Sequence, residues 1–216
     1  APAWRGHSDT EILLAAVEAW GFEGALARAV GMFAIALWDR ESASLHLARD
    51  RIGEKPLYYG RTPQGFAFAS ELKAIRALTR GALEIDPSVL SEFMQFGYIP
   101  SPRCIYRGLA KLPPGHLVRI GRDGVADDPR PYWSLDTAVP ADLRAQLAGA
   151  DDAQLVELLH DRLHTSVGLQ MVSDVPLGAF LSGGVDSSTV VALMQAQSTR
   201  PVRTYTIGFR EKAFDE

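Results

Sequence analysis

The segment Ser182-Gly183-Gly184-Val185-Asp186-Ser187-Ser188 decides the fold of the second part of the chain. The apolar run at 175–181 before it is short and bounded, as in a buried strand of a parallel sheet. The residues after it carry apolar side chains at helical spacing through Gln197. A strand, a glycine turn and a helix in this order bring backbone N–H groups and the positive end of a helix dipole to an anion. The segment therefore predicts a phosphate-binding loop.

Spacing separates this loop from two other nucleotide-binding patterns. No Lys follows the glycines, as a Walker A loop requires, and G-x-G-x-x-G is absent. The hydroxyls of Ser182, Ser187 and Ser188 are expected to add donors. Asp186 would repel a bare phosphate, so its carboxylate predicts a Mg²⁺ between itself and the phosphates. The alternative is an ordinary Gly-Gly turn in which Asp or Ser caps the next helix. Because the strand, the helix and the Ser/Asp pattern agree, we favour a nucleotide phosphate site.

Composition and charge limit the class of protein and the partners to be expected. The 216 residues are 47% hydrophobic, enough for one good core or two modest ones. The net charge is −4 and Lys and Arg are scattered, so neither a nucleic acid nor an anionic membrane is expected as a partner. Cys104 is the single cysteine, which argues against a disulfide framework or a Cys metal cluster and favours a cytoplasmic setting. No apolar stretch is long enough to span a bilayer.

Residues 1–133 alternate between helix and strand signals. Helices are predicted at 9–20, where Gly21 ends the first, and at 23–30, 71–78 and 87–96. Short strands at 32–38, 45–50, 57–59 and 66–68 predict an antiparallel meander. A hairpin around 122–124 is predicted to join 117–120 to a run ending at Trp133.

The pattern changes after Trp133. Residues 134–150 lack periodicity and are expected to be a linker. An amphipathic helix is predicted from Asp151 through Val167, and strands at 175–181 and 202–209 flank the loop and its helix as in a doubly wound α/β domain. Two parallel strands cannot cover their own apolar faces, so the second domain is expected to be incomplete as given.

These motifs together resemble one known family. The loop at 182–188 is similar to the pyrophosphate-binding loop of ATP pyrophosphatases, and SDVPLGAFL at 173–181 narrows the resemblance to the synthetase domain of glutamine-dependent asparagine synthases. Earlier segments resemble the glutaminase domain of the same family: SDTE at 8–11, GMFA at 31–34, ARDRIGEKPLYY at 48–59, ASELKA at 69–74 and KLPPGH at 111–116. The resemblance covers nearly the whole chain, in the family's order.

The resemblance implies an α/β two-domain fold. Residues 1–133 would form the second half of an N-terminal-nucleophile-hydrolase-like α/β/β/α glutaminase sandwich, a class II glutamine amidotransferase domain. Residues 134–150 would link it to 151–216, the first part of a Rossmann-like, parallel-sheet ATP-pyrophosphatase domain.

The resemblance also implies ATP-dependent synthesis of asparagine from aspartate and glutamine. Glutamine hydrolysis would supply ammonia to a β-aspartyl-AMP intermediate, with release of AMP and pyrophosphate. ATP and Mg²⁺ are the implied cofactors, and glutamine, aspartate and ATP are the implied small-molecule partners. A homodimer in the cytoplasm is the implied state.

The matched motifs carry the site residues. Asp9 matches the carboxylate that binds the glutamine α-amino group, although Ser8-x-x-Glu11 also predicts a capping box with Asp9 in the first helical turn. The positions implied to bind ATP are Leu181, Ser182, Gly183, Gly184, Asp186, Ser187, Ser188, Ile207 and Gly208. Asp186 would reach Mg²⁺ at the pyrophosphate, and core packing is the alternative role for Leu181 and Ile207.

Part of the family's glutamine machinery does not occur in this sequence. The chain begins Ala1-Pro2, so the N-terminal cysteine nucleophile is absent, and the family's arginine and Asn-Gly-Glu contributions would lie upstream. Cys104 is no substitute because its amine is in a peptide bond, and it is expected to be a quiet, apolar thiol. We expect either an internal fragment of a longer protein or an inactive glutaminase half.

Roles in ion pairs and turns are expected for four charged residues, Arg49, Asp50, Lys55 and Glu71. His160 and His164 stand four residues apart but lack a third ligand, so they are expected to form the polar edge of a helix. Two other functions stay open: a β-lactam-synthetase-like adenylylating enzyme with an inert glutaminase half, and a non-catalytic ATP-binding remnant.

Overall fold

The computed structural model describes residues 4–6 and 8–208 and shows a mixed α/β chain with several sheets. Its contacts divide the chain into two units, Ala1–Val139 and Pro140–Glu216. The division falls inside the segment 134–150. None of the helices in the described ranges is both long enough and apolar enough to cross a membrane.

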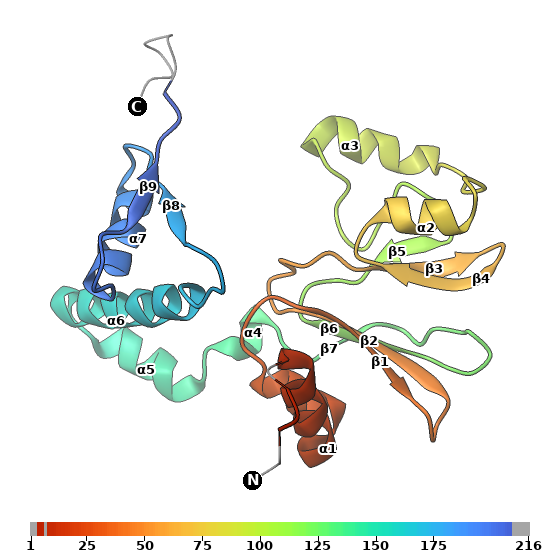
Figure 1. Ribbon diagram of the computed structural model, residues 1–216, viewed down its shortest axis with the longest axis horizontal. Helices are drawn as coiled ribbons and strands as arrows, with labels where there is room; N and C mark the ends of the chain where they lie inside the picture. Colours follow the sequence, from red (N-terminus) through yellow and green to blue (C-terminus); the bar gives the residue numbers. More distant parts are fainter. Residues whose placement is uncertain (1–3, 7, 209–216) are drawn as a thin grey trace. The chain divides into compact units, whose positions relative to one another are not determined.

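The elements of the first unit follow one another along the chain (Figure 1). They are α1 (Asp9–Arg28), β1 (Ala34–Asp39), β2 (Ser44–Arg49), β3 (Tyr58–Thr62), β4 (Gly65–Ala69), α2 (Leu72–Leu78), the 3-10 turn η1 (Pro87–Val89), α3 (Leu90–Phe96), β5 (Leu109–Lys111), β6 (His116–Ile120), β7 (Arg130–Pro131) and α4 (Leu135–Ala138). The second unit holds α5 (Ala141–Gly149), α6 (Asp152–Gln170), β8 (Gly178–Phe180), α7 (Val185–Ala196) and β9 (Arg203–Tyr205).

The strands of the first unit form two antiparallel sheets, in the orders β1-β2-β6-β7 and β4-β3-β5. The expectation of one continuous meander is therefore wrong. Strand β6 pairs with β2, and the unpredicted strand β5 pairs with β3, so each hairpin receives its next neighbour from far along the chain. The predicted hairpin that ends near Trp133 is present as the β6–β7 pair.

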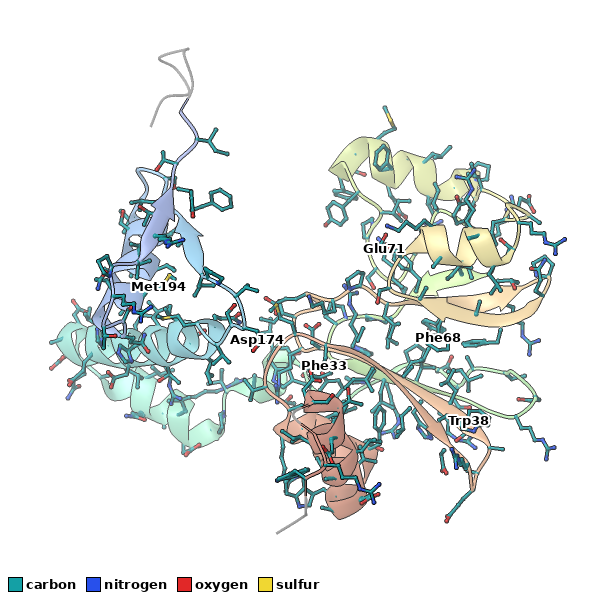
Figure 2. All side chains as sticks on the ribbon, viewed as in Figure 1. Phe33, Trp38, Phe68, Glu71, Asp174 and Met194 are labelled. Carbon is teal, nitrogen blue, oxygen red and sulfur yellow. The ribbon has the colours of Figure 1, made fainter. Side chains whose placement is uncertain are left out.

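Three apolar clusters order the first unit as helix, sheet, sheet, helix (Figure 1). Leu47 and Val118 of the first sheet meet Tyr59 of the second between the two sheets, where Figure 2 also shows Phe68. Leu26 of α1 packs on the outer face of the first sheet, and Ile75 of α2 packs on the outer face of the second. Because strand side chains alternate between faces, each sheet can contribute side chains to two of these clusters, one on each face.

The segment α1 consists of two helices that meet in a kink at Gly21, whose φ of 71° and ψ of 168° are not helical, so the predicted break between two helices is confirmed. The Ser8 hydroxyl caps the helix by accepting from Thr10 N–H at 3.2 Å. The predicted capping box is not formed, because the Glu11 carboxylate instead accepts from the N–H groups of Arg5 and Gly6. Arg5 and Gly6 thus take the acceptor that a capping box would use.

In the second unit, α6 and α7 bury Val167, Leu193 and Met194 against the two-stranded parallel sheet, and Met194 is labelled in Figure 2. The predicted helix from Asp151 is present as α6, and Asp151 and Gln154 form a reciprocal capping box at its start.

One expectation about this part of the chain is wrong. Strand β8 has three residues and is not buried, since Phe180 is 76% exposed. A sheet in which only β8 and β9 are paired among the described residues cannot cover both faces. The segment 134–150, which is expected to be a linker, holds α4 and α5, none of whose side chains is buried.

A buried carboxylate organises the turn after β2. Asp50 is 1% exposed, and its side-chain oxygens accept backbone N–H groups at 2.7–3.2 Å from Ile52, Gly53, Glu54 and Lys55. Burial raises the pKa of the Asp50 carboxyl, but the N–H groups of Lys55, Glu54 and Gly53 lower it by more, so the pKa lies below its ordinary value. Gly53 makes the turn feasible because its φ of 75° suits glycine.

Arg49 ties the same turn to the second sheet. Its guanidinium donates to the carbonyls of Gly53 at 2.5 Å, Lys55 at 2.8 Å and Leu112 at 2.9 Å, and Leu112 directly follows β5. The Tyr132 hydroxyl donates to the Arg49 carbonyl at 2.9 Å, and burial raises the pKa of Tyr132 to about 12. Arg49 and Asp50 thus make the turn contacts that the sequence predicts.

We predict that Asp50→Asn destabilises the first unit at neutral pH by about 3 kcal/mol, because it removes charge-assisted bonds and places an N–H₂ group against backbone donors. Since the folded-state pKa is lowered, the carboxylate stabilises the fold above its unfolded-state pKa of about 3.9 and this contribution is lost as pH falls through the folded value. Urea unfolding of wild type and variant at pH 7 and pH 3 should show a gap that narrows in acid.

Asp123→Asn is the matched control for this prediction. The Asp123 carboxylate is exposed and accepts one backbone N–H, from Val125 at 3.0 Å. It should change the free energy of unfolding by about 1 kcal/mol or less. If the two variants lowered the free energy of unfolding equally at pH 7, the Asp50 carboxylate would not stabilise the fold more than an exposed carboxylate does.

Candidate functional site

The glycine loop lies at the carboxyl ends of two adjacent parallel strands. Phe180 of β8 stands opposite Tyr205 of β9, and the N–H of Leu181 extends the ladder by donating to the Tyr205 carbonyl at 2.9 Å. Gly184 is the N-cap of α7, with extended φ and ψ of −78° and 157°, and no side chain caps the helix there. The backbone N–H groups of the first turn are therefore not occupied by a capping side chain and could donate to an anion.

The serine hydroxyls of the loop bind the loop's own carbonyls. Ser187 Oγ donates to the carbonyls of Ser182 at 2.8 Å and Gly184 at 3.2 Å, and Ser188 Oγ donates to Gly184 at 2.9 Å. Ser182 Oγ lies 3.0 Å from Ser187 Oγ. Among the described residues, the hydroxyl hydrogens of Ser187 and Ser188 serve the loop backbone, and their expected role as donors to phosphate stays a prediction.

Asp186 is the second residue of α7 and is exposed. Its carboxylate has no hydrogen-bond or ion-pair partner in the part of the chain that the structure describes. Within residues 4–6 and 8–208, no group of three or more His, Cys, Asp or Glu side chains is arranged to hold a metal ion. A cation at Asp186 would therefore take most of its ligands from a bound phosphate and from water.

The other residues matched to ATP flank the loop at the strand ends. Leu181 is half-buried and joins β8 to the loop, while Ile207 and Gly208 follow β9 and are exposed. Ile207 does not pack into a core among the described residues. Sequence reasoning missed Thr206, whose hydroxyl donates to the Leu181 carbonyl at 2.7 Å and ties the two strand ends together. No motif marks this residue, since the bond depends on the pairing of distant strands.

Asp9 lies at the edge of a cavity of about 670 Å³ in the first unit. Its Oδ1 accepts from Thr10 N–H at 2.8 Å, which keeps the carboxylate at the start of α1. The cavity lining is mostly apolar, from α1, residues 29–33 and the start of β1, and its other polar residues are Thr10, Arg28, Lys55 and Ser70. Lys55 reaches the cavity from the Asp50 turn. The structure thus brings Asp9 to a hollow that has room for a small molecule.

The remaining candidates have structural roles. Cys104 is 4% exposed, and burial raises the pKa of its thiol, as expected for a quiet cysteine. Glu71 forms an exposed ion pair with Lys73 at 2.5 Å. The rings of His160 and His164 lie 6.0 Å apart on α6.

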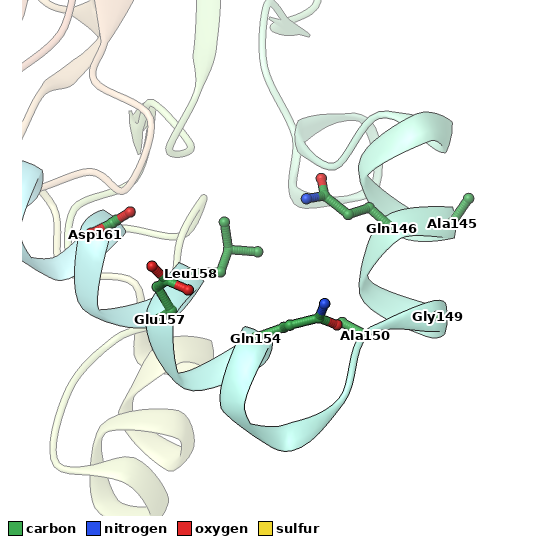
Figure 3. Close-up of a pocket in the computed structure, with 8 residues that line it drawn as sticks. All are labelled: Ala145, Gln146, Gly149, Ala150, Gln154, Glu157, Leu158 and Asp161. Carbon is green, nitrogen blue, oxygen red and sulfur yellow. The ribbon is translucent and has the colours of Figure 1, made fainter.

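A second hollow, of about 540 Å³, lies between α5 and α6 in the second unit (Figure 3). Its lining includes the amides of Gln146 and Gln154 and the carboxylates of Glu157 and Asp161. None of the loop residues lines it, so we do not place the phosphate chemistry there.

Comparison with known families and proteins agrees with this geometry. Residues 1–133 match the family model described as glutamine amidotransferase domain, which is more than half of the chain, and the chain belongs to that family. Residues 158–216, which contain the glycine loop, match the family model described as asparagine synthase.

Related proteins carry names that agree with both matches. The chain is 34% identical to asparagine synthetase [glutamine-hydrolyzing] 1 of Bacillus subtilis, over 97% of this chain and 31% of that protein. It is 36% identical to a putative asparagine synthetase [glutamine-hydrolyzing] of Mycobacterium bovis, over 96% and 31%. It is also 33% identical to amidase chry2 of Gibberella zeae, over 88% and 27%. The chain thus spans about a third of the length of these curated relatives.

Proposed function

We propose that the full-length protein makes asparagine from aspartate, glutamine and ATP. The observation that carries this proposal is the uncapped N-terminus of α7, set behind a Gly-Gly turn at the carboxyl ends of β8 and β9. Ligands bind at this edge of open α/β sheets, and the N–H groups of a first helical turn suit phosphate oxygens. The order of the two family matches supports glutamine as the source of ammonia.

We further propose the finer fold assignments that the resemblance implies. Residues 1–133 belong to an N-terminal-nucleophile-hydrolase sandwich, 134–150 to a linker, and 151–216 to a Rossmann-like ATP-pyrophosphatase domain. The helix, sheet, sheet, helix order of the first unit supports the first assignment, and the parallel β8–β9 pair with its crossover helix α7 supports the last. A cytoplasmic homodimer rests on the resemblance and on the single cysteine.

At the synthetase site, the β-carboxylate of aspartate attacks the α-phosphorus of ATP, and pyrophosphate leaves as β-aspartyl-AMP forms. Ammonia then attacks the activated carbonyl carbon, AMP leaves, and a proton is released as asparagine forms. The loop N–H groups of 183–187 would hold the pyrophosphate, whose negative charge grows as the P–O bond breaks. Leu181, Ser182, Ile207 and Gly208 would line the nucleotide at the two strand ends.

The residues present fit a Mg²⁺ ion beside the phosphates. The Asp186 carboxylate is exposed, unpaired among the described residues, and adjacent to the N–H groups of the helix start. Asp186 would hold the ion, which when bound would offset phosphate charge.

At the glutamine site, Asp9 would accept the α-ammonium group of the substrate. Its place at the edge of the cavity supports this role, because the carboxylate faces a hollow and its Oδ1 is held by the helix start. Cys104 is not the nucleophile, since it is buried and its thiol pKa is raised. The proposed chemistry therefore needs an N-terminal cysteine in the full-length protein, in line with the family resemblance.

A second candidate is a sister adenylylating reaction on another carboxylate, as in β-lactam synthetases. The similarity to a protein named as an amidase supports this second candidate, because it shows that the sequence pattern also occurs in proteins that are not named asparagine synthetase. An ATP-binding remnant without turnover is less favoured, since the loop keeps both glycines and Asp186.

The deciding experiment is pyrophosphate release by the full-length protein from ATP and Mg²⁺, with aspartate and an ammonium salt. Aspartate-dependent release with asparagine as product would establish the reaction, and glutamine in place of ammonium would test the first unit. ATP binding without aspartate-dependent release would favour the sister reaction or the remnant.

We predict that Asp186→Ala lowers aspartate-dependent pyrophosphate release by at least about two orders of magnitude, because the phosphates lose the carboxylate that would hold the cation. Glutamine hydrolysis should change little. Asp161→Ala, which removes an exposed carboxylate from α6, is the matched control and should leave both activities intact. Equal loss of both activities in the Asp186 variant would argue against two separate sites.

We predict that Asp9→Asn raises the KM for glutamine by about 10- to 100-fold, because a charge-assisted bond to the substrate ammonium is lost. Synthesis from ammonium salts should be unchanged. Glu18→Gln, an exposed carboxylate farther along α1, is the control and should leave the KM for glutamine unaltered. An Asp9 variant with a normal KM would remove this residue from the site.

A further inference from the structure

Two carbonyl groups of the glycine loop, and that of Leu181 directly before it, accept side-chain hydroxyl hydrogens. Thr206 Oγ1 donates to the Leu181 carbonyl at 2.7 Å. Ser187 Oγ donates to the Ser182 carbonyl at 2.8 Å, and Ser188 Oγ donates to the Gly184 carbonyl at 2.9 Å. The hydroxyls come from β9's end and from the first turn of α7, so they reach the loop from two sides.

A hydrogen bond to a carbonyl also orients the next residue's N–H. The peptide unit is planar, and in the trans form its C=O and N–H groups point in opposite directions. Ser101–Pro102 is the cis bond found in the described residues, so the loop peptides are trans. Holding the Leu181 carbonyl therefore aims the N–H of Ser182 away from Thr206. In the same way, Ser187 and Ser188 aim the N–H groups of Gly183 and Val185.

Thr206 differs from the two serines because it is not part of the loop or of α7. It follows β9, and the backbone bond from Leu181 N–H to the Tyr205 carbonyl lies beside it. Leu181 is therefore held on its N–H side by β9 backbone and on its C=O side by the Thr206 hydroxyl. Thr206 is also exposed, so its methyl group contributes little to a core.

We propose that Thr206 is a positioning residue for the pyrophosphate group of ATP: by holding the Leu181 carbonyl, it fixes the direction of the Ser182 N–H at the entrance of the loop. The inference rests on the proposed function, because it assigns Thr206 a role in the same nucleotide site. Thr206 itself donates its hydrogen to the backbone and leaves phosphate contact to the N–H groups. The chemical group that it serves is an inorganic or nucleotide-bound pyrophosphate.

The test is a set of single substitutions in the full-length protein. Thr206→Val keeps the shape and removes the hydroxyl, and Thr206→Ser keeps the hydroxyl and removes the methyl group. Thr204→Val is the matched control, because Thr204 lies on β9 two residues earlier, is exposed, and makes no hydroxyl hydrogen bond in the described part of the chain. Titration calorimetry with magnesium pyrophosphate and with magnesium ATP gives the Kd values, and thermal unfolding reports stability.

We expect Thr206→Val to raise the Kd for pyrophosphate about fivefold to tenfold, the effect of one lost hydrogen bond, with an unchanged melting temperature. Thr206→Ser and Thr204→Val should bind as wild type does. The inference is overturned if Thr206→Val binds pyrophosphate normally, or if both valine variants lose affinity equally. Failure of the wild-type protein to bind either ligand would instead refute the proposed nucleotide site.

Discussion

The first unit depends on the buried carboxylate of Asp50 and the N–H groups that surround it. This residue directly follows β2 in the first sheet, and its own backbone carbonyl accepts from Gly115 N–H at 2.8 Å, directly before β6. Arg49, one residue earlier, reaches the carbonyl of Leu112 after β5. The two residues thus join the turn after β2 to the segment that connects the second sheet back to the first.

Opposing effects act on that carboxylate, and their balance explains why an ionised group can be buried there. Removal from water disfavours the charged form, and without hydrogen-bond partners a buried carboxyl group would be protonated instead. The backbone N–H groups of the turn act in the opposite direction and prevail, since the pKa is lowered. The turn requires the left-handed conformation at Gly53, which glycine adopts readily. The conformation of this one residue therefore bears on how the two sheets are joined.

The sequence predicts local structure better than pairing. The start of α6 at Asp151, the break at Gly21 and the helix after Gly184 follow from capping and glycine chemistry within a few residues. The division into two sheets does not, because β6 and β5 return to their partners over long separations that a strand signal does not encode. The capping box at Ser8 failed for a similar reason, as the chain at Arg5 and Gly6 took the Glu11 carboxylate.

The glycine loop shows the same limit at the scale of single hydroxyl groups. Its residue types and spacing predict an anion site, and the uncapped start of α7 at the ends of β8 and β9 is what such a site needs. The sequence does not reveal which donors face outward. A serine in this pattern can offer its hydroxyl to a phosphate or to a carbonyl, and in this loop the carbonyls of Ser182 and Gly184 accept it. Side chains that hold carbonyls fix the opposite N–H groups, so donors that never touch a ligand can still determine how well the backbone receives one.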